Sequence, residues 1–114
     1  DQVLIPMEAE YLAFRGVNSI IGIINSVKEH FNPNLNISGV FLTKYNNQRK
    51  LTQEIENSIH KYFGSVLLNS KIRVNVALAE SQASGVDIFQ YDVSSNGAKD
   101  YQSLVTELIE KMIV

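Results

Sequence analysis

Short continuous hydrophobic runs alternate along the chain with longer segments in which hydrophobic residues recur at helical spacing. The runs cover residues 3–7, 37–42 and 66–68. A run of this kind is typical of a strand buried on both faces, as in a parallel sheet covered by helices. These three segments are therefore predicted to be β-strands.

Two segments between the runs carry apolar residues every three or four positions, which places those residues on one face of a helix. The first predicted helix lies within residues 10–31, with a leading turn broken off at Gly16. The second covers residues 51–63 and ends at Gly64, a residue suited to a left-handed helix stop. Helices of this length between strands imply right-handed parallel crossovers. The predicted fold class is α/β, a parallel sheet of about three strands with flanking helices.

The last third of the chain predicts two further helices. Asn75 is expected to cap a short helix that ends near Gly85, and residues 87–96 have the composition of a loop. A final helix is predicted from Ala98, with an apolar stripe that should pack on the sheet: Tyr101, Leu104, Val105, Leu108, Met112 and Ile113. The alternative is a membrane-surface anchor, which needs many basic residues on its polar face. Acidic residues outnumber basic ones here, which disfavours the anchor: Lys99 and Lys111 against Asp100, Glu107 and Glu110.

Composition narrows the class of protein. The chain has 114 residues, 45% hydrophobic and 19% charged, which is typical of one globular domain. It shows neither a signal sequence nor a run of the ~20 apolar residues that span a membrane, so we expect a cytoplasmic protein. The net charge of −2 argues against a globally basic nucleic-acid-binding protein, and the lack of cysteine excludes disulfides and thiolate metal sites.

The sequence predicts no complete active site. It contains neither a G-x-x-x-x-G-K-[ST] phosphate loop nor a G-x-S-x-G elbow. His30 and His60 fall near polar helix faces without another ligand at metal-binding spacing, so we expect both to be solvated. Catalytic and metal-ligating residues are therefore not assigned.

Ligands of open parallel sheets bind beyond the carboxyl ends of the strands, so the polar segments there are candidate sites. Residues 43–50 follow the second predicted strand and residues 71–75 follow the third. Their basic residues could form a local patch or could be ordinary solvated charges: Lys44, Arg49, Lys50, Lys71 and Arg73.

Two long blocks resemble a known family. LIPMEAEYLAFRGVNSIIGIINSVKEHFNPNLNISGVFLTKYN is similar to the region of ParA/Soj-type partition ATPases after their second nucleotide motif. SKIRVNVALAESQASGVDIFQYDVSSNGAKDYQSLVTELIEKM resembles their C-terminal stretch. The resemblance covers essentially the whole chain. It implies that residues 1–114 are a single domain, the C-terminal half of a P-loop NTPase fold with a deviant Walker A motif, and that the N-terminal phosphate-binding half is absent.

The resemblance implies an ATPase that uses ATP and Mg²⁺, dimerises around ATP, binds DNA non-specifically and is stimulated by a ParB-like protein. Such proteins segregate plasmids or chromosomes at the nucleoid and need no membrane. Because the family's phosphate loop and its metal and catalytic acidic residues lie upstream of the matching region, this chain alone is expected to bind no cofactor and to be inactive. The resemblance does not distinguish a protein that segregates plasmids from one that segregates chromosomes.

Site residues follow from the resemblance position by position. Those expected to contact the adenine of ATP are Thr43, Ile72, Arg73, Val74 and Asn75. Those expected to contact DNA are Lys44, Arg49, Lys50 and Arg73. The chain departs from the family at Ile72-Arg73-Val74-Asn75, where many relatives have I-P-R-N, and two family DNA-contacting arginines match Gln48 and Ala77.

Two other functions stay open at this point. One is a MinD-like positioning ATPase that binds membranes, and the other is a stand-alone α/β interaction domain without a nucleotide. A lysine-containing glycine loop upstream of the chain would distinguish the ATPases from the interaction domain.

Overall fold

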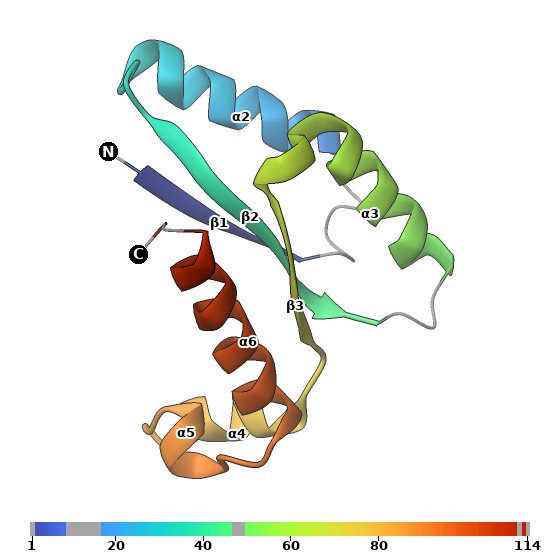
Figure 1. The fold of residues 1–114 in the computed structure, drawn as a ribbon, viewed down its shortest axis with the longest axis vertical. Helices are drawn as coiled ribbons and strands as arrows, with labels where there is room; N and C mark the ends of the chain where they lie inside the picture. The colour runs from blue at the N-terminus through green and yellow to red at the C-terminus, as the bar shows by residue number, and fades with distance from the viewer. Residues whose placement is uncertain (1, 9–16, 47–49, 112, 114) are drawn as a thin grey trace.

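The computed structural model describes residues 2–8, 17–46, 50–111 and 113. Its strands form one parallel sheet in the order β1 (Gln2–Glu8), β2 (Asn36–Tyr45) and β3 (Leu67–Arg73). Helices α2 (Val17–His30) and α3 (Lys50–Phe63) cover one face, and α6 (Asn96–Glu110) covers the other (Figure 1). The predicted α/β fold with a three-stranded parallel sheet is confirmed.

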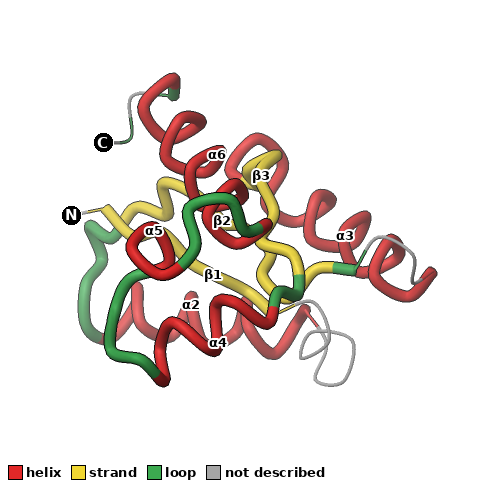
Figure 2. Tube along the Cα trace, turned by 90° about the horizontal axis from the view of Figure 1, so that it is seen from below, coloured by secondary structure: helices red, strands yellow, loops and turns green. Residues whose placement is uncertain are grey.

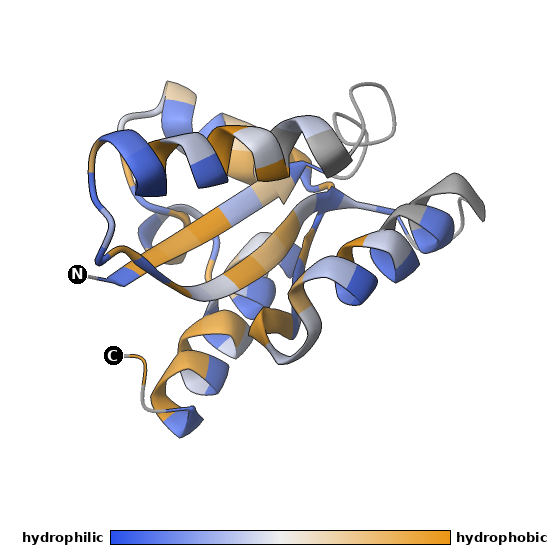
Figure 3. Ribbon diagram, turned by 90° about the horizontal axis from the view of Figure 1, so that it is seen from above, coloured by the Kyte–Doolittle hydropathy of each residue, from blue (hydrophilic) through white to orange (hydrophobic). Residues whose placement is uncertain are grey.

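The sheet is buried on both faces, as the continuous apolar runs predict. Alternate residues of β2 point to opposite sides, so Val40 and Leu42 face α2 and α3 while Phe41 faces α6. Figure 3 shows the hydrophobic strands between the helical layers. The first cluster is Met7, Val40, Leu42 and Ile59, and the second is Phe41, Leu68, Ile72, Leu104 and Leu108. Leu104 and Leu108 confirm that the final helix packs on the sheet.

The third strand differs from its prediction at both ends. Val66 belongs to the 3₁₀ turn η1 (Gly64–Val66), and β3 runs on to Arg73. Hydrophobic patterning missed the extension because Asn69, Ser70 and Lys71 are polar. An edge strand can keep polar side chains in water, so its pattern is not that of a central strand.

The segment after β3 forms two short helices, α4 (Val76–Ala83) and α5 (Ile88–Tyr91), which lie together beside the start of α6 (Figure 2). The prediction of a loop over residues 87–96 was wrong, because Asp87 caps α5 by accepting a hydrogen bond from the Gln90 amide at 2.9 Å. The final helix begins at Asn96 and not at Ala98, since the Ser95 hydroxyl caps it. The expected first helix is α2, and the part of that prediction over residues 10–16 lies outside the described residues.

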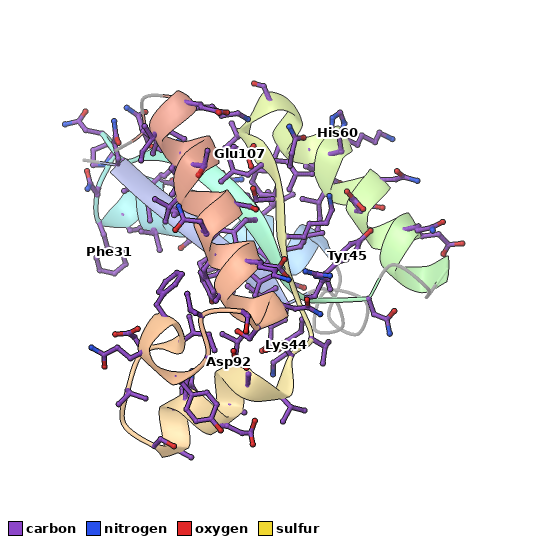
Figure 4. The ribbon with its side chains drawn as sticks, turned by 60° about the horizontal axis from the view of Figure 1, so that its bottom comes forward. Phe31, Lys44, Tyr45, His60, Asp92 and Glu107 are labelled. Atoms are coloured by element: carbon purple, nitrogen blue, oxygen red, sulfur yellow. The ribbon has the colours of Figure 1, made fainter. Side chains whose placement is uncertain are left out.

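Glu107 of α6 satisfies the backbone of β3 at the outer edge of the sheet (Figure 4). Its carboxylate accepts hydrogen bonds from the Asn69 and Ser70 amides, each 2.8 Å long. The pairing of β2 with β3 shifts register here, because Val40 pairs with Leu67 but Leu42 pairs with Lys71. The extra residues form a bulge, and the carboxylate of Glu107 binds the amides that the ladder leaves out.

These hydrogen bonds change the acidity of Glu107. Burial by itself would raise the pKa of Glu107, but the hydrogen bonds from Asn69, Ser70 and Lys111 outweigh it and lower the pKa from 4.5 to about 2. A carboxylate whose pKa is lower in the folded than in the unfolded chain stabilises the folded state above pH 4.5, by about 3 kcal/mol here. That contribution is lost as the pH falls from 4.5 towards about 2.

We predict that Glu107→Gln lowers the free energy of unfolding at pH 7 by about 2–3 kcal/mol, because an amide offers one acceptor oxygen where two backbone donors must be satisfied. Denaturant unfolding followed by circular dichroism measures this change. The difference between wild type and variant should shrink as the pH falls from 4.5 to about 2. Glu110→Gln, an exposed change on the same helix, should alter stability by less than about 0.5 kcal/mol. A difference that does not depend on pH would contradict this role of Glu107.

Candidate functional site

A pocket of about 880 Å³ lies at the carboxyl ends of β2 and β3. The position is the usual ligand site of an open parallel sheet, and the volume falls within the range of small-molecule sites, ~300–1,000 Å³. The five residues that the sequence associates with adenine all contribute to its lining: Thr43, Ile72, Arg73, Val74 and Asn75. Two segments some thirty residues apart in the chain thus meet at one site.

Most of the remaining lining comes from the C-terminal helices and the loop between α4 and α5, and Lys44 of β2 also contributes. Its apolar members include Leu78, Val86, Phe89, Tyr101 and Val105. Sequence reasoning missed this wall, because Tyr101 and Val105 fit the helical stripe and were assigned to packing on the sheet. Tyr101 does pack there, and it lines the pocket as well. Val105 is 42% exposed. Helical spacing could not have separated it, because its angle around the helix falls between those of Leu108 and Ala98, which are both buried.

The pocket segment of β3 is held from the β2 side by the main chain. Tyr45 pairs with Arg73 in the sheet, and the Val74 amide donates a hydrogen bond of 3.3 Å to the Tyr45 carbonyl. Between Thr43 and Tyr45, Lys44 has a φ of +50°, a left-handed conformation that non-glycine residues seldom adopt. Strain of this kind tends to accumulate at functional sites.

Asn75 provides an unsatisfied polar atom in the lining. It occupies the N-cap position of α4 as predicted, but its side chain forms no capping hydrogen bond. Its Oδ1 is buried and accepts no hydrogen bond from any described residue. Gly97 packs beside it, since a Cβ at that position would lie 3.1 Å from Oδ1 and 2.6 Å from Leu78 Cγ. An unsatisfied buried acceptor costs about 1–3 kcal/mol until a donor reaches it.

Asp100 of α6 binds Arg73 at three atoms. Its carboxylate accepts hydrogen bonds from the Arg73 amide at 2.9 Å, from Nε at 3.0 Å and from Nη2 at 2.9 Å. The hydrogen bonds and the charge of Asp100 raise the pKa of Arg73. The guanidinium fork that the sequence associates with both adenine and DNA is therefore engaged by a carboxylate from the same chain.

A second cluster ties α3 to the two neighbouring strands. The Tyr45 hydroxyl donates a 2.8 Å hydrogen bond to Glu56, and Lys71 Nζ lies 2.9 Å from the other Glu56 oxygen. Lys71 also lies 5.4 Å from the centre of the Tyr45 ring, within cation–π range. Burial and the hydrogen bond to Glu56 raise the pKa of Tyr45 to about 12. Burial would raise the pKa of Glu56, but the hydrogen bonds from Lys71 and Tyr45 lower it.

The basic patch expected at this edge is largely neutralised in the part of the chain that the structure describes. Lys44, at the end of β2 (Figure 4), lies 2.9 Å from Glu8, and Lys71 and Arg73 are paired as above. The Lys44 pair is exposed, at 64% and 47% for the two side chains, and a phosphate could displace Glu8 at little cost. Arg49 and the side chain of Lys50 lie outside the described residues.

Neither a metal site of three or more ligands nor a membrane-spanning helix is found among the described residues. No group of three or more His, Asp or Glu residues there could hold a metal ion. His30 and His60 are exposed on α2 and α3. None of the described helices is both long enough and apolar enough to cross a membrane.

Comparison with known proteins places these features in a family. Residues 3–88 match the CobQ/CobB/MinD/ParA nucleotide binding domain. The chromosome-partitioning ATPase Soj of Treponema pallidum is 33% identical over 111 residues, which are 97% of this chain and 44% of that protein. The chromosome partitioning protein ParA of Myxococcus xanthus is 31% identical over 97% of the chain and 39% of its own length. The sporulation initiation inhibitor protein Soj of Bacillus subtilis is 33% identical over 95% of the chain and 43% of its own length.

The chain thus spans less than half the length of these relatives. The domain match covers most of the chain and includes β1 from its second residue, β2, β3, Thr43 and residues 72–75. The resemblance on the two sequence blocks is confirmed. The chain belongs to the CobQ/CobB/MinD/ParA nucleotide-binding family and is of the ParA/Soj type.

Proposed function

We propose that this chain is the C-terminal part of a ParA-like ATPase that segregates plasmid or chromosomal DNA, and that its pocket holds the adenine nucleoside of ATP. The observation that carries the proposal is the convergence of Thr43 and residues 72–75 on one pocket. Relatives named as a partitioning ATPase and as partitioning proteins support the wider role.

The lining suits a purine nucleoside. Apolar side chains such as Leu78 and Phe89 offer contact surface for a flat base. Asn75 Oδ1 lacks a donor, and the exocyclic amino group of adenine is one. The Thr43 hydroxyl and the main chain of residues 72–75 supply further polar groups. When bound, ATP and Mg²⁺ supply the phosphoryl group and its charge neutralisation, and we assign no residue of this chain to the phosphates.

We predict weak nucleoside binding by this chain, with a Kd of about 1 mM, because base contacts alone provide only a few kcal/mol. Titration with adenosine and with ATP, followed in ¹H–¹⁵N amide spectra, should shift Thr43 and residues 72–75. The two ligands should bind within about threefold of each other, with or without Mg²⁺, because the chain has no phosphate loop.

Asn75→Ala should weaken both ligands at least about fivefold through loss of the amide. The matched control is Asn34→Ala, in the exposed turn after α2, which should leave both affinities unchanged. Shifts centred on α2 and α3, or equal affinity of Asn75→Ala and wild type, would show that the pocket is not the nucleoside site.

We further propose that the full-length protein dimerises on ATP, binds DNA without sequence preference at the nucleoid and responds to a ParB-like partner. The chain's contribution to DNA binding would come from Lys44, Arg49 and Lys50, which lie on or follow the end of β2. A role for Arg73 stays a prediction, since a phosphate would have to share its guanidinium with Asp100.

We predict that duplex DNA binds with a Kd of ~10⁻⁴ M or weaker at physiological salt, since few cations contribute. Lys44→Glu with Arg49→Glu should weaken binding at least about tenfold at low salt. The matched control is Lys28→Glu with Lys61→Glu, which makes the same change in net charge. These residues lie in the last turns of α2 and α3, towards the amino ends of the strands. Fluorescence anisotropy with unrelated duplexes measures both. Equal loss in the control, or preference for one duplex sequence, would contradict this placement of the DNA surface.

A further inference from the structure

We infer that Asp100 is a positioning residue that decides what Arg73 can bind. Asp100 binds both the main chain and the guanidinium of Arg73. The resulting pair has no net charge and offers hydrogen-bond donors to the nucleoside. Without Asp100, Arg73 would be a free cation that favours phosphates. The inference rests on the proposed nucleoside-binding function of the pocket.

The geometry gives Asp100 control of two parts of Arg73 at once. Its Oδ2 accepts from both the Arg73 amide at 2.9 Å and Nε at 3.0 Å, while Oδ1 accepts from Nη2 at 2.9 Å. The amide bond fixes the last residue of β3, from which the chain turns into Val74 and Asn75. The fork fixes the direction of the side chain. Loss of Oδ2 would therefore release the Arg73 amide and leave the guanidinium held by Oδ1 alone, through Nη2 at 2.9 Å and Nε at 3.3 Å.

Burial of the carboxylate distinguishes the Arg73–Asp100 pair from the neighbouring Lys44–Glu8 pair. Asp100 is 9% exposed, so the carboxylate cannot leave Arg73 for water without unpairing both groups. Glu8, in contrast, holds Lys44 through one contact between two exposed side chains, so a phosphate can replace it. The Arg73–Asp100 pair consequently presents little net charge to a ligand, and it attracts phosphate less than its sequence suggests.

Arg73 still has hydrogen bonds to give. A guanidinium has five N–H donors, and Asp100 occupies the one on Nε and one on Nη2, which leaves three. The side chain is 49% exposed and lines the pocket. A donor group without net charge suits the neutral acceptors of a base or ribose, the nucleoside end of the ligand.

The test compares Asp100→Asn with Glu107→Gln. Both remove a carboxylate of α6 that binds β3 amides, but Asp100 binds Arg73, which lines the pocket, whereas Glu107 binds Asn69 and Ser70, which do not. Adenosine and inorganic triphosphate are titrated against each folded protein by amide spectra, and duplex DNA by anisotropy over a range of salt. Asp100→Asn should bind adenosine at least about fivefold more weakly and triphosphate more tightly. Its DNA affinity should gain about one unit of salt dependence, the value of one added phosphate contact. Glu107→Gln should change none of these ligand affinities by more than about twofold.

Each outcome decides a separate claim. If wild type binds no adenosine, the proposed function fails, but the triphosphate and DNA measurements still test Asp100. If Asp100→Asn keeps the wild-type affinity for adenosine and gains none for phosphates, the inference is overturned.

If Asp100→Asn does not fold, Arg73→Gln replaces it. This variant should lose adenosine affinity while its DNA salt dependence stays within about half a unit of wild type, because the charge of Arg73 is already cancelled. A fall of about one unit would mean that Arg73 acts as a free cation, and would overturn the inference.

Discussion

No strand among the described residues pairs with the outer edge of β3, so its backbone amides need other partners, and α6 supplies them with two carboxylates. Glu107 binds the amides of Asn69 and Ser70, and Asp100 binds the amide of Arg73. Both residues are buried, with side chains that are 11% and 10% exposed for Asp100 and Glu107. Replacing a strand partner by charged side chains is costly in desolvation, and three hydrogen bonds from the backbone offset that cost.

The spacing of the two carboxylates matches helix to strand. They are seven residues apart, which in a helix is about two turns and ~10 Å along one face. Three or four residues of strand separate Arg73 from Ser70 and Asn69, a rise of ~10–13 Å. The same face of α6 can therefore bind both ends of the segment while Leu104, between the carboxylates in sequence, packs on Leu68 and Ile72. One helix both closes the sheet and forms a wall of the pocket.

The sequence predicted the parts of the fold that depend on hydrophobic patterning. Val40, Phe41 and Leu42 form a continuous run because both faces of β2 are covered. It could not predict the length of β3, where polar side chains face water and the stabilising group lies 37 or 38 residues further along the chain. The resemblance supplied the positions expected to contact adenine, and these converge on one pocket. It did not predict that the charge of Arg73 is neutralised there. The sequence alone presents Arg73 as an unpaired cation. Asp100 lies 27 residues further along the chain, and only the fold brings it to Arg73.

The most direct measurement of this account is amide hydrogen exchange at the outer edge of β3, resolved by residue in ¹H–¹⁵N spectra. If the carboxylates of α6 replace a strand partner, the amides of Asn69, Ser70 and Arg73 should exchange as slowly as those of β2, with an opening free energy near that of global unfolding. Exchange of these amides at the rate of exposed loop amides would show that α6 does not satisfy the edge, and would contradict both its closure of the sheet and its role in the pocket.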